Sequence, residues 1–126
     1  MELILIGLHL EHQVDNDIYN SLNHISDNGF VLLHDCNPPT EKHQIKKYDE
    51  KSPWNGTVWK SIAKLRMKEK NLKIYTVDTD LGCWNNKKNA NGNDILQTET
   101  LTYKFLEKNR KKVLNLIYVS EFLKIF

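Results

Sequence analysis

The stretch FVLLHDCNPP, residues 30–39, joins an apolar run to a cluster of polar side chains and a pair of prolines. The apolar part predicts a strand, because a short run of large apolar residues fits a buried pleated surface. The prolines then end the regular structure. His34, Asp35 and Asn37 therefore stand at the end of a predicted strand, where structure alone does not require them.

A second apolar run, ELILIG over residues 2–7, precedes this stretch. Its Ile and Leu residues predict a strand buried on both faces, as in the centre of a parallel sheet. Between the two runs, apolar residues recur at helical spacing and predict a helix over residues 11–25, which SDNG at residues 26–29 ends with a turn. Strand, helix and strand in this order predict a βαβ unit with a right-handed crossover.

The rest of the chain predicts one long loop and further helices and strands. The loop, residues 36–56, is polar and contains all three prolines and Trp54. The sequence then predicts a helix at 57–70 with Thr57 as N-cap, a strand at 72–80, a fourth strand returning as a hairpin at 81–86, a loop at 85–93, and helices at 101–112 and at 120–126 with Ser120 as N-cap.

This order predicts an α/β fold in a single domain over residues 1–126. It corresponds to the second half of a doubly wound, Rossmann-like sheet with additional C-terminal helices. None of the five glycines forms a GxG motif, so the sequence contains no glycine-rich loop for a dinucleotide or an adenosyl cofactor. The predicted domain is therefore incomplete and lacks its N-terminal, cofactor-binding half.

Composition excludes several classes of function. Charged residues make up 27% of the chain and the net charge is only +2, which does not favour nucleic-acid binding. No apolar run approaches the ~20 residues of a membrane-spanning helix. The two cysteines, Cys36 and Cys83, leave a single disulfide open as an alternative. They form no CxxC pair, however, and we expect free thiols and a cytoplasmic location.

The carboxyl ends of parallel strands are where α/β sheets bind ligands. If the first two strands are parallel neighbours, His9, His34, Asp35 and Asn37 converge at one edge of the sheet. A histidine there can act as a general base, and carboxylate and amide oxygens can hold a divalent metal. The alternative is structural, with Asp35 and Asn37 forming an Asx-turn into the prolines.

The segment GLHLEHQVDNDIYNSLNHISDNGFVLLHDCNPPTE, residues 7–41, resembles the second half of a class I S-adenosylmethionine-dependent methyltransferase. It is most similar to a bacterial group linked to O-methylation of sugars and small molecules. WNGTVWKSIAKLR, VDTDLGC and LTYKFLEKNRKKVLNLI also resemble later segments of that group, in the same order. The resemblance implies methyl transfer from S-adenosylmethionine to a hydroxyl group of a small-molecule acceptor.

The resemblance also implies roles for individual residues. His9 matches the candidate catalytic base, and Asp35 matches a carboxylate that binds a divalent metal such as Mg²⁺ in metal-dependent relatives. His34, Asn37 and Trp54 would lie on the substrate-binding side. The chain departs from the family at Ile6, where the family has the aspartate that supplies its other metal ligand.

Without the missing half, the first strand leaves one apolar edge unpaired, which favours association. We therefore expect a homodimer, or a partner chain bound through this strand, and no activity from the chain alone. A second hypothesis is a non-catalytic remnant, or a subunit that completes the sheet of another protein.

Two further hypotheses rest on short motifs. Asp78 and Asp80 form a DxD triplet, which binds the metal of a nucleotide sugar in glycosyltransferases, although a hairpin turn explains the same residues. His9, His12 and Cys36 could approximate a zinc site, but their spacing matches no known ligand pattern.

Overall fold

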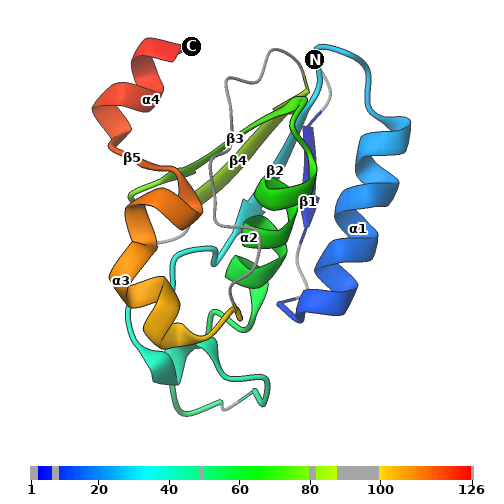
Figure 1. Ribbon diagram of the computed structural model, residues 1–126. Helices are drawn as coiled ribbons and strands as arrows, with labels where there is room; N and C mark the ends of the chain where they lie inside the picture. Colours follow the sequence, from blue (N-terminus) through cyan, green and yellow to red (C-terminus); the bar gives the residue numbers. More distant parts are fainter. Residues whose placement is uncertain (1–2, 7–8, 49, 80–81, 88–99, 126) are drawn as a thin grey trace.

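The structure is a computed structural model and describes residues 3–6, 9–48, 50–79, 82–87 and 100–125. Its elements are the strands β1 (Leu3–Ile6), β2 (Phe30–His34), β3 (Leu72–Val77), β4 (Gly82–Lys87) and β5 (Leu116–Ile117), the helices α1 (Glu11–His24), α2 (Val58–Lys68), α3 (Tyr103–Leu114) and α4 (Val119–Ile125), and a short 3₁₀ helix, η1 (Glu41–Gln44). They are shown in Figure 1.

The five strands form one mixed sheet in the order β1-β2-β4-β3-β5. β1 and β2 are parallel neighbours, with Leu5 opposite Leu32 and Ile6 opposite Leu33. β4 lies antiparallel between β2 and β3, and β5 is parallel to β3. The predicted α/β class and the parallel pairing of the first two strands are therefore confirmed, as is the antiparallel return of the fourth strand.

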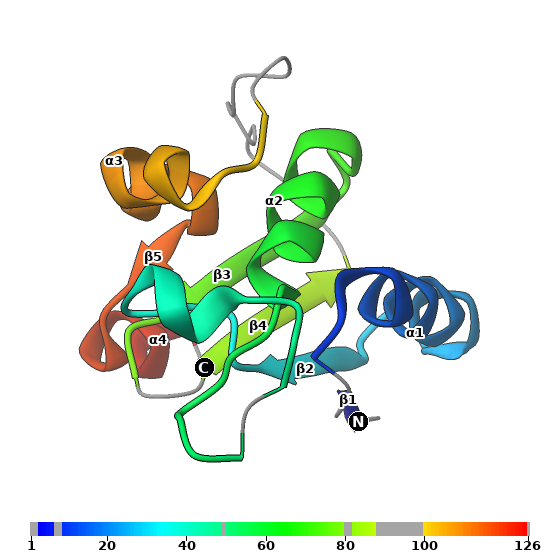
Figure 2. The ribbon, with the colours of Figure 1, turned by 90° about the horizontal axis from the view of Figure 1, so that it is seen from below.

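The helices α1, α2 and α3 lie over one face of the sheet (Figures 1 and 2). The reason is visible in β2, where Val31 and Leu33 are buried. The alternate residues, which point to the opposite face, are only half-buried: Phe30, Leu32 and His34. The apolar stripes of the helices pack on the buried set. The core between helices and sheet includes Val14, Ile18, Val31, Leu33, Val58, Trp59, Ile62, Leu65, Ile74, Leu106, Val113 and Leu114.

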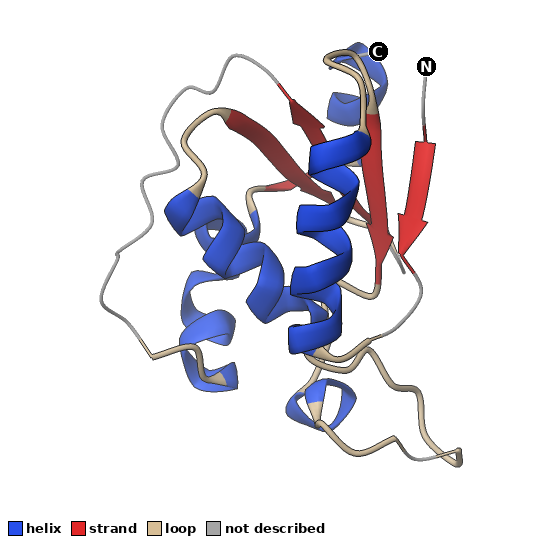
Figure 3. Ribbon diagram, turned by 90° about the vertical axis from the view of Figure 1, so that its right-hand side faces the viewer, coloured by secondary structure: helices blue, strands red, loops and turns tan. Residues whose placement is uncertain are grey.

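β1 lies at the edge of the sheet and not at its centre (Figure 3). Its sequence alone favoured a central position, because a strand that is covered on both sides carries apolar residues on both of its faces and therefore forms a continuous apolar run. Among the described strands, β1 pairs only with β2. The apolar character of β1 thus exceeds what its place in the described sheet explains.

Several predicted boundaries are wrong. β3 ends at Val77, and β4 extends to Lys87, so the predicted loop at 85–93 begins at least three residues too early. The backbone N–H groups of Glu121 and Phe122 donate to the Tyr118 carbonyl at 3.0 Å, so α4 starts earlier than the predicted cap. The Glu121 carboxylate accepts a hydrogen bond from the Tyr118 N–H at 2.8 Å, which places Ser120 inside the helix.

Arg66 joins α2 to the C-terminal end of α3. Its side chain is 5% exposed and donates to the carbonyl oxygens of Val113 at 3.0 Å, Lys112 at 3.2 Å and Ile74 at 3.0 Å. The cation therefore supplies donors to carbonyls that a helix end leaves without partners. Burial lowers the pKa of Arg66 to about 10, so the side chain stays charged at neutral pH.

None of the helices in the described part of the chain is long and apolar enough to span a bilayer.

Candidate functional site

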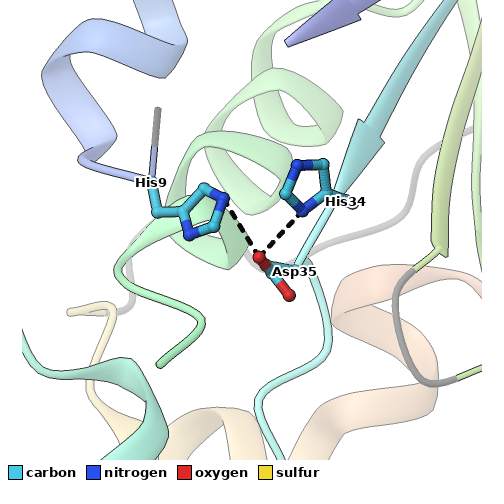
Figure 4. A group of neighbouring side chains, drawn as sticks. All are labelled: His9, His34 and Asp35. Atoms are coloured by element: carbon cyan, nitrogen blue, oxygen red, sulfur yellow. Dashed lines mark hydrogen bonds and ion pairs between the residues drawn. The ribbon is translucent and has the colours of Figure 1, made fainter. Parts of the chain in front are cut away.

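The ends of β1 and β2 bring three polar side chains together. Because the two strands are parallel neighbours, both finish at the same edge of the sheet. His9 follows β1 and precedes α1, His34 is the last residue of β2, and Asp35 comes directly after it. Figure 4 shows their side chains pointing toward one another.

The carboxylate of Asp35 is the centre of this cluster. Its Oδ2 atom lies 3.0 Å from Nε2 of His9 and 2.8 Å from Nδ1 of His34. The two imidazole rings meet edge to face, with ring centroids 4.7 Å apart and an angle of 88° between their planes. One carboxylate oxygen is therefore shared by two imidazoles.

The backbone and a neighbouring amide fix the orientation of Asp35. Asp35 has a φ of 62°, in the left-handed region that residues other than glycine seldom adopt. Its other carboxylate oxygen, Oδ1, accepts a hydrogen bond from Nδ2 of Asn55 at 3.1 Å. Both residues are buried, at 7% exposure each. A strained backbone held by surrounding contacts is typical of a functional position.

The start of α2 holds His9 in place. The backbone N–H of Thr57 donates to the His9 carbonyl oxygen at 2.8 Å, and the Thr57 hydroxyl accepts from the Glu11 N–H at 2.9 Å. Thr57 is the residue before α2 as predicted, but its side chain caps α1 and not α2. Gly56 approaches so closely that an added Cβ would lie 2.0 Å from the His9 oxygen.

Trp54 covers His9 from the loop. Its ring centroid lies 5.3 Å from that of His9, and its indole N–H donates to the Ile45 carbonyl at 2.6 Å. The loop itself is anchored by Trp59, a fully buried core residue whose indole N–H donates to the Gln44 side chain at 3.0 Å. Trp54 therefore lies beside His9, whereas Trp59 lies in the core. The predicted role of Trp54 in substrate binding stays a prediction.

Burial is the largest influence on His9 and lowers its pKa below the ordinary value of 6.5. The charge of Asp35 opposes this effect, the neighbouring His34 adds to it, and the backbone of Trp54 opposes it. His9 has an 18% exposed side chain, and neither of its ring nitrogens makes a hydrogen bond of good geometry within the described residues. The neutral imidazole is therefore favoured.

Asn37 belongs to a different set of contacts. Its Oδ1 accepts from Nη1 of Arg110 at 2.6 Å, and the same guanidinium nitrogen donates to the Pro38 carbonyl at 2.8 Å. Arg110 also donates from Nη2 to the Tyr103 hydroxyl at 3.1 Å. Asn37 thus ties the loop after β2 to α3. Its predicted role in substrate binding stays a prediction.

The other predicted motifs fall outside the cluster. Asp78 is exposed after β3, and Asp80, the second aspartate of the DxD triplet, lies outside the described residues. His12 and His24 are exposed on α1. Among the described residues the group with metal-ligating geometry is His9, His34 and Asp35, which differs from the predicted set of His9, His12 and Cys36.

The expectation of free thiols is wrong for Cys36. Cys36 is fully buried and is disulfide-bonded. A cysteine beside an apolar strand has the same sequence pattern whether it packs in the core as a free thiol or forms a disulfide. The spacing of the two cysteines therefore did not predict the bond.

The magnesium ion that the resemblance implies does not fit the residues present. Mg²⁺ requires oxygen ligands in near-octahedral geometry. In the cluster, Asp35 supplies the oxygen and both other donors are imidazole nitrogens. The position of the family's second carboxylate is Ile6, which has no ligand atom.

Sequence reasoning found His9, His34 and Asp35 but missed the residues that support them. Asn55 and Gly56 form an Asn-Gly pair, which is a turn signal and could have indicated a tight approach to the chain. Arg110 gave no signal, because its partners are distant in sequence.

Comparisons of the chain with protein-family models, with curated proteins and with solved structures find no match.

Proposed function

We propose that the chain forms the acceptor-side half of a methyltransferase-like domain and that its histidine–aspartate cluster removes a proton from a small-molecule hydroxyl group, such as that of a sugar. The observation that carries the proposal is the contact of Asp35 with His34 at 2.8 Å and His9 at 3.0 Å, at the carboxyl ends of parallel strands. Ligands of open α/β sheets bind at this edge.

The order of the strands supports the proposal. β1, β2 and β3 run in one direction and lie in this order across the sheet, with the antiparallel β4 inserted between β2 and β3. Apart from the inserted β4, this order is similar to that of strands 4, 5 and 6 of a doubly wound sheet, which supports the proposal. β1 would then take a neighbour from the half that carries the cofactor.

The exposure of the two rings favours His34 over His9 as the proton acceptor. The His34 side chain is 34% exposed, whereas both ring nitrogens of His9 are buried. A carboxylate that binds Nδ1 of a histidine holds the ring with Nε2 directed outward and stabilises the imidazolium that forms. Asp35 is placed to serve His34 in this way, and Trp54 beside His9 would border the bound acceptor.

The described residues do not fit S-adenosylmethionine. β1 is the last strand on its side of the described sheet, so no described element stands where a cofactor-binding strand, loop and helix would lie. The proposal assigns cofactor binding to a neighbouring half that pairs with β1, supplied by a further part of the polypeptide or by a partner chain.

One experiment tests this assignment directly. The polypeptide encoded immediately upstream of residue 1 is produced together with the chain, and S-adenosylhomocysteine is titrated into each part and into the complex. We expect binding by the complex, near one site per chain, and none by the folded chain alone. A stable complex that does not bind S-adenosylhomocysteine would overturn the methyltransferase proposal.

Self-association is the alternative use of the β1 edge. A homodimer through β1 would satisfy the backbone groups on the edge of β1 that no described strand pairs with. Light scattering at high protein concentration tests it, and a monomer at all concentrations would exclude it. The same result, together with failure of the upstream polypeptide to bind, would favour the non-catalytic remnant.

The cytoplasmic location stays a prediction. The disulfide at Cys36 favours an oxidising compartment instead, because disulfides are rare in reducing ones. Mass spectrometry of the protein from its native cells, with and without reduction, decides between them.

A further inference from the structure

We propose that His9, His34 and Asp35 form a binding site for a divalent transition-metal ion such as Zn²⁺, in place of the Mg²⁺ site of metal-dependent methyltransferases. This inference goes beyond the proposed function and does not depend on methyl transfer. An ion bound here would replace the direct contact between Asp35 Oδ2 and Nδ1 of His34, so the metal-bound cluster and the proton-accepting cluster are alternative states of the same residues.

The geometry of the three donors is close to that of a metal site. Asp35 Oδ2 lies 3.0 Å and 2.8 Å from the facing nitrogens of His9 and His34, and all three ligand atoms lie within 4.8 Å of one another. With metal–ligand bonds of about 2.1 Å, neighbouring ligands are about 3.0 Å apart in an octahedron and about 3.4 Å apart in a tetrahedron. Side-chain rotations that move the ligand atoms by about 1 Å would therefore bring all three within bonding distance of one ion.

The kind of donor selects the kind of metal. Two imidazoles and one carboxylate form the ligand set of catalytic zinc sites and of several iron(II) sites. Neutral imidazole suits Zn²⁺, Co²⁺ and Ni²⁺, whereas Mg²⁺ prefers oxygen and retains its water. The resemblance implies a second carboxylate at the position of Ile6, and its replacement by a side chain without a ligand atom shifts the preference of the site away from Mg²⁺.

The environment of His9 gives independent support. Both of its ring nitrogens are buried, and within the described residues neither makes a hydrogen bond of good geometry, although the Asp35 carboxylate lies 3.0 Å from Nε2 and the backbone of Trp54 is close to the ring. Most buried polar atoms in folded proteins have such a partner, and exceptions require an explanation. An ion bound at Nε2 would satisfy the nitrogen that faces Asp35.

The surrounding contacts orient the ligands without occupying the position of the ion. Asn55 donates to Oδ1 of Asp35 at 3.1 Å and leaves Oδ2 directed at the two histidines. The Thr57 N–H fixes the backbone of His9 at 2.8 Å. Such outer contacts are typical of metal sites and increase affinity by holding the ligands in place. The partial exposure of the His34 side chain, 34%, leaves room for water or a substrate oxygen as a further ligand.

The test uses the tag-free chain, treated with chelator, in two measurements. Isothermal titration compares ZnCl₂ with MgCl₂, and Co²⁺ is added to record its visible absorption spectrum. We expect one Zn²⁺ per chain, at least about 100-fold tighter than Mg²⁺, and a Co²⁺ spectrum in which imidazole nitrogen is coordinated.

The variants His34→Gln and Asp35→Asn identify the ligands, with His12→Gln and His24→Gln as controls on the exposed face of α1. We expect each ligand variant to lose more than about 100-fold in Zn²⁺ affinity, because the loss of an outer contact already costs up to about 100-fold. The control variants should bind Zn²⁺ as tightly as the wild type. Circular dichroism and thermal unfolding establish that each variant is folded.

Three outcomes would overturn the inference: Mg²⁺ binding as tightly as Zn²⁺, Zn²⁺ binding that survives both ligand substitutions, or an equal loss in the controls. Should a ligand variant fail to fold, the ring-proton signals of His9 and His34 in the wild type decide. Paramagnetic shifts of these signals on addition of Co²⁺ support the site, and their absence contradicts it. Because no measurement uses S-adenosylhomocysteine, failure here is distinct from failure of the methyltransferase proposal.

Discussion

The backbone N–H of Thr57 donates to the carbonyl oxygen of His9 at 2.8 Å, although the two residues are 48 positions apart in the chain. The bond joins the start of α2 to the segment between β1 and α1. It makes the position of His9 depend on a helix whose sequence contains none of the cluster residues. The geometry of the site is therefore a property of the packed helices as well as of the two strands.

Gly56→Ala should displace His9. Gly56 has a φ of 61°, and an added Cβ would lie 2.0 Å from the His9 carbonyl oxygen, which cannot rotate away. We expect a loss of about 2 kcal/mol or more in the free energy of unfolding, together with weaker Zn²⁺ binding. Urea denaturation and zinc titration measure the two effects.

Gly29→Ala is the matched control for this substitution. Its Cβ would collide with the Ile25 side chain at 2.1 Å, at the end of β2 opposite to the cluster. We expect lower stability but unchanged Zn²⁺ affinity. A loss of zinc binding in Gly29→Ala equal to that in Gly56→Ala would show that general destabilisation explains both.

Arg66→Ala should cost about 3 kcal/mol in the free energy of unfolding, because it removes the side-chain donors of the Val113 and Lys112 carbonyl oxygens at the end of α3, whereas the Ile74 carbonyl keeps its hydrogen bond from Asn115. Arg66→Lys should recover little, since an ammonium group cannot reach three carbonyls in the planar geometry of a guanidinium. Urea denaturation provides the values. The control is Lys68→Ala, on the exposed part of the same helix, for which a change within about 0.5 kcal/mol is expected.

The stability of the protein should fall as pH decreases below the ordinary His9 pKa of 6.5. Burial lowers the pKa of His9 in the folded state, so the unfolded state binds more protons over the interval between the two pKa values. The contribution of neutral His9 to the free energy of unfolding is fully present above pH 6.5. It is lost as the pH falls toward the pKa of His9 in the folded state. His9→Gln should show a smaller change in melting temperature between about pH 7.5 and about pH 5.5 than the wild type. An identical change in both proteins would contradict a buried, neutral His9.

Asn37→Ala should loosen the loop after β2 and leave the cluster intact. Its oxygen accepts the 2.6 Å hydrogen bond from Arg110, so we expect a loss of about 1 kcal/mol in stability. Zn²⁺ affinity should remain unchanged. A selective loss of zinc binding with normal stability would instead place Asn37 among the groups that act at the site.

Much of the fold follows from local patterns. The apolar run before His34 predicts a strand, and the helical spacing of Val14 and Ile18 predicts an amphipathic helix. Both predictions hold because burying an apolar face stabilises the element whose periodicity places the apolar residues on that face. Boundaries were less predictable. The ends of β3, β4 and α4 depend on partner strands and on capping contacts such as that of Glu121, which the local sequence does not specify.

The sequence by itself determined that His34 and Asp35 stand at the end of a strand and that His9 follows another. Only the tertiary structure decided which polar groups meet. Asn37 is two residues from Asp35 and yet binds Arg110 on α3, while Asn55, twenty residues away, binds the Asp35 carboxylate. The physical reason is that hydrogen bonds and ion pairs form between groups that packing brings within about 3 Å, whatever their separation along the chain.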